Sequence, residues 1–201
     1  GIPAEPLFRS MYFVAKAKEV QTDIFFAEQY KPKESYDYEL IGYYQAKNKQ
    51  PSLCPIEQLV KQGYHISKEN IQNGLMHVTH NTGLRGRWQI VHHSPTVICD
   101  TGHNVGGITY TAQQLKEQKC NTLRIVFGMV SDKDVNSVLE LMPKNAVYYF
   151  CQASVKRAMP HQQLKKLAKQ HGLQGNSYKS VENAYKKAFS QADPKDCIFV
   201  G

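Results

Sequence analysis

The segment ICDTGHN carries three polar side chains that could bind a substrate, Asp100, His103 and Asn104. They follow the apolar run Thr96–Cys99, which predicts a buried strand, and they precede a segment of helical period. Ligands of open parallel sheets bind where strands end and helices begin. An ionised aspartate can accept hydrogen bonds from ribose hydroxyls or an ammonium group, while a histidine and a helix N-terminus can hold a carboxylate or phosphate. The alternative is that Asp100 or Asn104 only caps the helix.

Two other segments offer side chains suited to a nucleotide. GLRGRW contains Arg85 and Arg87 separated by a glycine, and the planar guanidinium of arginine suits phosphate. A solvated turn is the alternative, with Trp88 as a packing residue. In YQAKN, Asn48 follows a predicted strand and precedes a predicted helix, so its amide could bond the edge of a base or cap the helix.

Several kinds of site are excluded or disfavoured. The chain has no Gly-Lys pair and therefore no Walker-type phosphate loop, and CDTGHNVGG lacks the G-x-G-x-x-G pattern of dinucleotide binding. His77 and His80 share a predicted helix and His92 and His93 are adjacent, but no third ligand lies at a suitable spacing. We therefore expect no metal site made by this chain alone.

Composition is that of an ordinary globular protein. The 201 residues are 41% hydrophobic and 21% charged, with no apolar run long enough to span a membrane. Five cysteines, odd in number and without a C-x-x-C pair, argue against a disulfide framework and predict a reducing, cytoplasmic location. Up to Ser94 there are 11 basic and 9 acidic residues, and after it 14 and 8, so the second half favours anionic ligands.

The order of apolar runs predicts two parts. After Ser94, short apolar runs alternate with amphipathic helical segments, which predicts an α/β, Rossmann-like domain with a mostly parallel sheet over residues 93–201. Residues 1–90 predict an incomplete set of helices and strands, so the chain is expected to be a fragment. The predicted strands are Asp23–Ala27, Tyr38–Tyr44, Thr96–Cys99, Leu123–Phe127, Ala146–Cys151, Asn176–Lys179 and Cys197–Val200. The predicted helices of the first part are Leu7–Val20, Ser52–Gln62 and Ser67–His80.

Taken together, these segments resemble the folylpolyglutamate synthase and dihydrofolate synthase ligases of the Mur ligase superfamily. The resemblance covers nearly the whole chain, through ELIGYYQAKN, ISKENIQNGL, LRGRWQ, ICDTGHN, IVFGMVSDKD, SVENAYKKAF and CIFVG. Its most specific segments are FGMVSDKD and the D-x-x-H-N pattern after a strand. It implies that residues 1–90 are the C-terminal part of a central P-loop ATP-binding domain. Residues 93–201 would be the C-terminal ligase domain without its last segment.

The resemblance also implies roles for individual residues. Asn48 would contact the adenine, Arg87 the nucleotide phosphates, and Asp100 the nucleotide and the incoming glutamate, which His103 would help to hold. Magnesium would accompany ATP, with its ligands mainly in the part of the family's chain that precedes residue 1.

The sequence departs from the usual family pattern at three places. Thr101-Gly102 stands where Gly-Ala is common, Val105 stands where proline is common, and Tyr44 replaces a frequent histidine. Neither of the first two changes removes a polar contact group.

The reaction implied is an ATP-dependent carboxylate–amine ligation. A carboxylate of folate or dihydropteroate would attack the γ-phosphate of ATP, and the amine of L-glutamate would then displace phosphate from the acyl phosphate. The parent would be a cytoplasmic monomer without nucleic-acid or membrane partners, and this fragment alone would be inactive. Two alternatives remain, a Mur-type ligase that adds an amino acid to a cell-wall precursor and a non-catalytic basic binding module.

Overall fold

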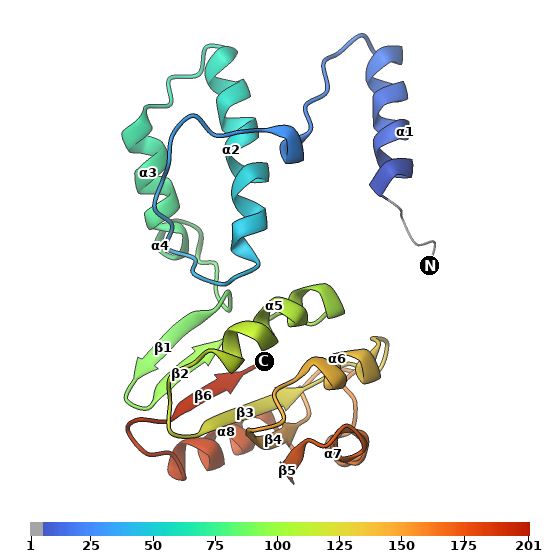
Figure 1. The fold of residues 1–201 in the computed structure, drawn as a ribbon, viewed down its shortest axis with the longest axis vertical. Coiled ribbons are helices and arrows are strands. Elements are labelled where there is room, and N and C mark those ends of the chain that lie inside the picture. The colour runs from blue at the N-terminus through green and yellow to red at the C-terminus, as the bar shows by residue number, and fades with distance from the viewer. Residues whose placement is uncertain (1–5) are drawn as a thin grey trace. The chain divides into compact units, whose positions relative to one another are not determined.

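The structure is a computed structural model that describes the backbone of residues 6–201, and the side chains of residues 11–27, 29–49 and 51–201 (Figure 1). It divides into two compact units. One contains residues 6–35 and 47–68, and the other contains residues 36–46 and 69–201. The predicted domain division between residues 90 and 93 stays a prediction. Among residues 6–201, none of the helices combines the length and apolar composition that crossing a membrane requires.

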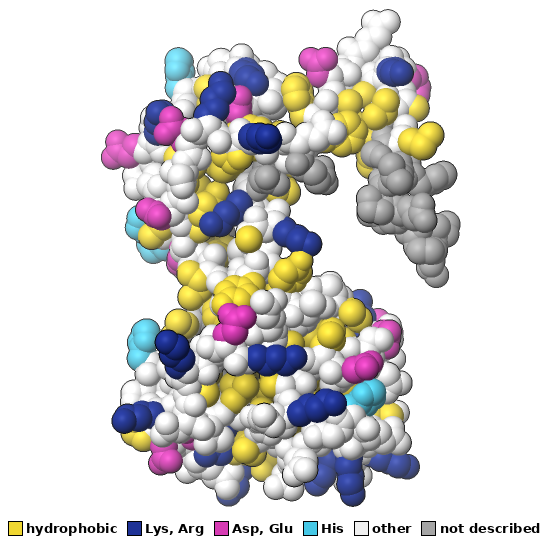
Figure 2. Space-filling view, in the orientation of Figure 1, with side chains coloured by type: hydrophobic (Ala, Val, Ile, Leu, Met, Phe, Trp, Pro, Cys, Tyr) yellow, Lys and Arg dark blue, Asp and Glu magenta, His cyan; other side chains and the backbone are white. Residues whose placement is uncertain are grey.

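The first unit is helical. It holds α1 (Pro6–Glu19), the 3-10 turn Ala27–Gln29 and most of α2 (Gln45–Lys61). Both helices predicted for this region are present, but α2 begins seven residues before the predicted Ser52, so Asn48 lies inside the helix and not ahead of it. The strand predicted at residues 23–27 is wrong. Its apolar side chains have no ladder to join, and Phe25 is 55% exposed. Apolar side chains also gather on the surface of α1, where Met11, Tyr12 and Phe13 are largely exposed (Figure 2).

The second unit is built on one six-stranded sheet with the order β1-β2-β6-β3-β4-β5. The strands are β1 (Gln89–His93), β2 (Thr96–Cys99), β3 (Leu123–Gly128), β4 (Val147–Cys151), β5 (Gln174–Ser177) and β6 (Cys197–Val200). Only β1 runs antiparallel to its neighbour. The mostly parallel α/β sheet is therefore confirmed, with β5 beginning two residues earlier than predicted.

Helices cover both faces of this sheet (Figure 1). Alternate side chains of each buried strand point to opposite faces. Thus Ile125 and Phe127 join the core beneath α5 (Val105–Lys116), α6 (Val135–Leu141) and α7 (His161–Gln170), while Val126 joins the core beneath α8 (Val181–Ser190). This arrangement places the carboxyl ends of β2, β6, β3 and β4 along one edge.

Before the sheet, the chain forms α3 (Lys68–Met76) and α4 (Val78–Thr82), where one helix was predicted over residues 67–80. The break falls at His77, the N-cap residue of α4. The strand predicted at residues 38–44 is wrong, because this segment bonds to a helix backbone and to a side chain instead of a neighbouring strand. Glu39 N donates to Leu75 O of α3 at 3.1 Å. The buried amide of Gln114 accepts from Tyr43 N at 2.8 Å and donates to Ile41 O at 3.2 Å.

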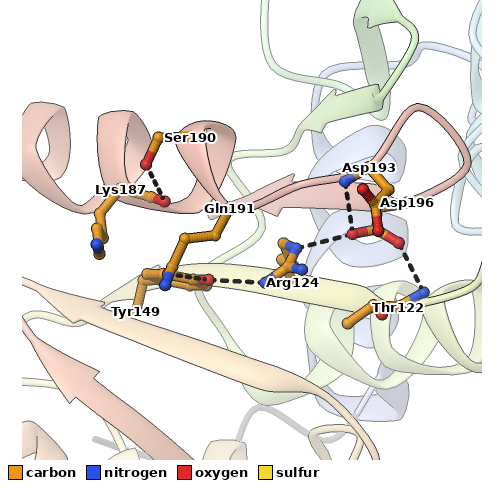
Figure 3. A network of polar contacts seen from close by, with 8 residues as sticks. All are labelled: Thr122, Arg124, Tyr149, Lys187, Ser190, Gln191, Asp193 and Asp196. Carbon is orange, nitrogen blue, oxygen red and sulfur yellow. Dashed lines mark hydrogen bonds and ion pairs between the residues drawn. The ribbon is translucent and has the colours of Figure 1, made fainter.

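A buried polar network lies beside α8 (Figure 3). Arg124 of β3 donates through Nε to Asp196 at 3.0 Å, and through Nη1 to the Tyr149 hydroxyl at 2.9 Å. The Tyr149 hydroxyl donates onward to Gln191 at 3.0 Å. Asp196 also accepts from the backbone N–H groups of Thr122 and Asp193. The network ties β3 and β4 to the turn before β6.

Candidate functional site

Asp100 directly follows β2 and is 3% exposed. Its Oδ2 accepts hydrogen bonds from the Tyr44 hydroxyl and from Trp88 N, and its Oδ1 accepts from Gly102 N, each at 2.7 Å. Burial, and then the hydrogen bond to Asp100, raise the pKa of Tyr44 well above its usual range, so the hydroxyl stays a donor. Asp100 therefore joins three chain segments and does not cap α5.

Asn104 supplies the cap. Its Oδ1 accepts from Gly107 N at 2.7 Å, in the position of an N-cap residue of α5. The capping interpretation is thus confirmed for Asn104. His103, directly before it, is exposed, with Nδ1 3.1 Å from Thr101 O. The loop therefore turns the His103 ring toward solvent at the start of a 12-residue helix.

Arg87 lies beside this loop. Its Nη1 donates to Thr101 Oγ1 at 2.5 Å, and Trp88, the next residue, is buried against Phe199 of β6 with ring centroids 6.1 Å apart. The structure therefore confirms Trp88 as a packing residue. Through residues 100 and 101 it also brings Arg87, Asp100 and His103 into one connected group.

Asn48 belongs to a different part of the structure. It lies on α2 in the first compact unit and is exposed, and its carbonyl accepts from Ser52 Oγ at 2.8 Å. Its predicted contact with the adenine stays a prediction.

A cavity of about 250 Å³ adjoins the connected group in the second unit. Its lining includes the apolar residues Leu40, Leu84, Trp88 and Ile90 and the charged residue Arg87. Two larger cavities, about 450 and 490 Å³, lie around Cys120 and Asn121 at the opposite edge of the sheet. In the part of the chain that the structure describes, no three His, Cys, Asp or Glu side chains gather as metal ligands.

Sequence reasoning missed three residues that organise the site. Tyr44 bonds to Asp100, Thr101 bonds to Arg87, and Gln114 holds the segment that contains Tyr44. Of these three residues, only Gln114 could have been found from a pattern in the sequence. It lies on the face of α5 that also carries the buried Ile108 and Leu115, where a polar side chain needs a partner.

Gly86 is a point of close approach. Its φ is +67°, and a Cβ there would lie 2.6 Å from Thr101 Cγ2. We expect Gly86→Ala to lower the free energy of unfolding by at least about 2 kcal/mol, because left-handed strain and a steric clash add. Chemical denaturation of the chain measures this.

Gly83→Ala is the matched control. Gly83 has a φ of +69°, but nothing lies within 4 Å of the added Cβ. Gly83→Ala should lower the free energy of unfolding by only about 1 kcal/mol, because it adds the left-handed strain without a clash. Equal losses in the two variants would show that the approach of Thr101 to Gly86 contributes nothing.

Comparison with known families decides what this fold is. A family model described as the glutamate ligase domain of Mur ligases matches residues 86–201, more than half of the chain. The chain belongs to the Mur ligase family. The ligase domain of this Mur ligase thus contains β1 to β6, together with Arg87, Asp100 and His103.

Curated relatives of the Mur ligase carry the names of folylpolyglutamate and dihydrofolate synthases. It is 29% identical over 141 residues to the dihydrofolate synthase/folylpolyglutamate synthase of Escherichia coli K12, covering 69% of this chain and 31% of that protein. It is 28% identical over 162 residues to a probable bifunctional folylpolyglutamate synthase/dihydropteroate synthase of Haloferax volcanii, covering 80% of this chain and 18% of that one. The resemblance is therefore confirmed, and the chain spans less than a third of either relative.

Solved structures of proteins with these names are also similar to the chain. The E. coli FolC structure in complex with DHPP and ADP is 28% identical, with a TM-score of 0.61, and the match covers 72% of this chain and 34% of that one. A Yersinia pestis bifunctional folylpolyglutamate synthase/dihydrofolate synthase complexed with AMPPNP and Mn matches 98% of this chain and 48% of that one. Its TM-score is 0.71 at 22% identity, which shows the likeness of fold.

Proposed function

We propose that the chain is the C-terminal portion of a folylpolyglutamate synthase, dihydrofolate synthase, or an enzyme with both activities. The observation that carries the proposal is the position of Arg87. Its side chain donates a hydrogen bond to Thr101, next to Asp100 and His103 in the loop after β2. A guanidinium, an exposed imidazole and a helix N-terminus together suit the phosphates of ATP and the carboxylates of glutamate. The names of the curated relatives and solved neighbours support the same activity.

In this proposal each residue has a separate task. Arg87 neutralises the nucleotide phosphates, and His103 holds the incoming L-glutamate. Asp100 uses its remaining acceptor capacity for the nucleotide or the glutamate ammonium, since three donors already occupy part of its carboxylate. Asn48 contacts the adenine.

A magnesium ion would accompany ATP and offset phosphate charge, held mainly by residues outside this chain. Support for a divalent ion comes from a Yersinia pestis relative with Mn, AMPPNP and L-glutamate bound. The chain's own contribution is positive charge and exclusion of water around the phosphates. This fits phosphoryl transfer, which depends mainly on positioning and charge neutralisation.

The sequence of bond changes follows from the substrates. An oxygen of the folate or dihydropteroate carboxylate bonds to the γ-phosphorus of ATP as the bond to the β–γ bridging oxygen breaks, which releases ADP. The amine of glutamate then attacks the acyl carbon, phosphate leaves, and the amine loses a proton.

Five cysteines without a disulfide in the structure support a reducing, cytoplasmic location for this reaction. The enzyme is proposed to act as a monomer.

The test is addition of glutamate by the full-length ligase, with dihydropteroate, tetrahydrofolate and a cell-wall nucleotide precursor as competing acceptors. Glutamate addition to either folate-type acceptor supports the proposal. Activity with the cell-wall precursor alone would transfer the chain to the other branch of the family. The 201-residue chain by itself is the matched sample, and we expect no ligation from it.

A further inference from the structure

We propose that Thr101 is a positioning residue that holds the Arg87 guanidinium ready for an anionic phosphate ligand. The inference rests on the phosphate-binding role of Arg87 proposed above. Thr101 Oγ1 lies 2.5 Å from Arg87 Nη1 and 3.1 Å from Gly86 O. Because a guanidinium only donates hydrogen bonds, the Thr101 hydroxyl must accept from Arg87 and give its own proton to the Gly86 carbonyl. Both polar functions of the hydroxyl are thus used to orient one side chain.

The backbone around Arg87 is fixed independently of that hydroxyl. Thr101 N donates to Gly86 O at 2.9 Å, before Arg87, and Trp88 N donates to Asp100 Oδ2 at 2.7 Å, after it. Two consecutive residues, Asp100 and Thr101, therefore anchor both neighbours of Arg87. The freedom that remains is in the torsions of the Arg87 side chain, and the Thr101 hydroxyl restricts it.

This arrangement leaves the Arg87 guanidinium able to bind an anion. Arginine has five N–H donors in a planar fork, and Thr101 engages one of its terminal nitrogens. Arg87 is partly exposed and Thr101 is exposed, so an anion can reach both. Ordering a flexible arginine before binding removes part of the entropic cost of association, which corresponds to roughly 3- to 10-fold in affinity.

The first test needs no ligand. Side-chain NMR of the 201-residue chain compares Arg87 in wild type, Thr101→Val and Thr101→Ser. Valine keeps the branched shape but has no hydroxyl, whereas serine keeps the hydroxyl. We expect Thr101→Val to give averaged, faster-exchanging guanidinium signals and Thr101→Ser to resemble wild type. Unchanged Arg87 signals in Thr101→Val would overturn the proposal.

The second test uses the full-length ligase. Thr101→Val should raise KM for ATP roughly 3- to 10-fold, with kcat changed less than about two-fold, because weaker uniform binding acts on KM. Thr101→Ser should restore a KM near that of wild type. If Arg87→Ala raises KM and Thr101→Val does not, the positioning role is wrong. If Arg87→Ala leaves both kcat and KM unchanged, the proposed function of Arg87 is wrong, and this inference falls with it.

Discussion

Replacing Arg87 with alanine is expected to lower kcat/KM for ATP by about 100-fold or more in the full-length ligase, because charge developing on the phosphates loses a fixed cation. The Arg87 side chain donates a hydrogen bond to the exposed Thr101, while the bond from Trp88 N to the Asp100 carboxylate keeps the backbone in place. Steady-state kinetics with ATP as the varied substrate measures the effect.

Arg85→Ala is the control for this prediction. Arg85 carries the same charge two residues earlier and is exposed. Its removal should change kcat/KM less than about three-fold, since charge on a solvated surface is screened by salt. Equal losses in the two variants would mean that general positive charge, not the placement of Arg87, serves the reaction.

Replacing Asp196 with alanine is expected to lower the free energy of unfolding by about 3–5 kcal/mol, the cost of leaving a buried charge without its partner. The side chains of Asp196 and Arg124 are 1% and 13% exposed, and their atoms are 3.0 Å apart. The substitution also removes the acceptor for Thr122 N and Asp193 N (Figure 3). Urea denaturation of the chain measures the loss.

Asp132→Ala is the matched control, because Asp132 pairs with Arg157 at 2.9 Å with side chains 52% and 61% exposed. Its effect should stay within about 1 kcal/mol. A loss from Asp196→Ala no larger than this would contradict the assignment of the buried network as a main source of stability.

The same network makes the stability of the fold depend on pH. Burial works against ionisation of Asp196, but hydrogen bonds from Asp193 N and Arg124 outweigh it and lower the pKa of the carboxyl below its ordinary value. A carboxyl with a depressed pKa in the folded state stabilises the fold above its unfolded pKa. This stabilisation is lost as the pH falls through the folded-state pKa. Wild type should therefore lose stability below about pH 4 more steeply than Asp196→Ala.

The sequence by itself determined the sheet domain and the region of the site. Five apolar runs separated by amphipathic helices predicted the parallel strands, because a strand covered on both faces must be apolar along its length. The same periodicity placed Asp100, His103 and Asn104 at the start of α5. These features depend on residues close in sequence, so local pattern was sufficient.

The tertiary structure alone decided how the site is organised. Tyr44 bonds to Asp100 across 56 residues, and Arg87 bonds to Thr101 across 14. The segment containing Tyr44 was predicted as a strand, yet its backbone is held by the Gln114 side chain, 71 positions beyond Tyr43. No local pattern encodes such pairs, because a hydrogen bond depends on where the folded chain brings donor and acceptor together.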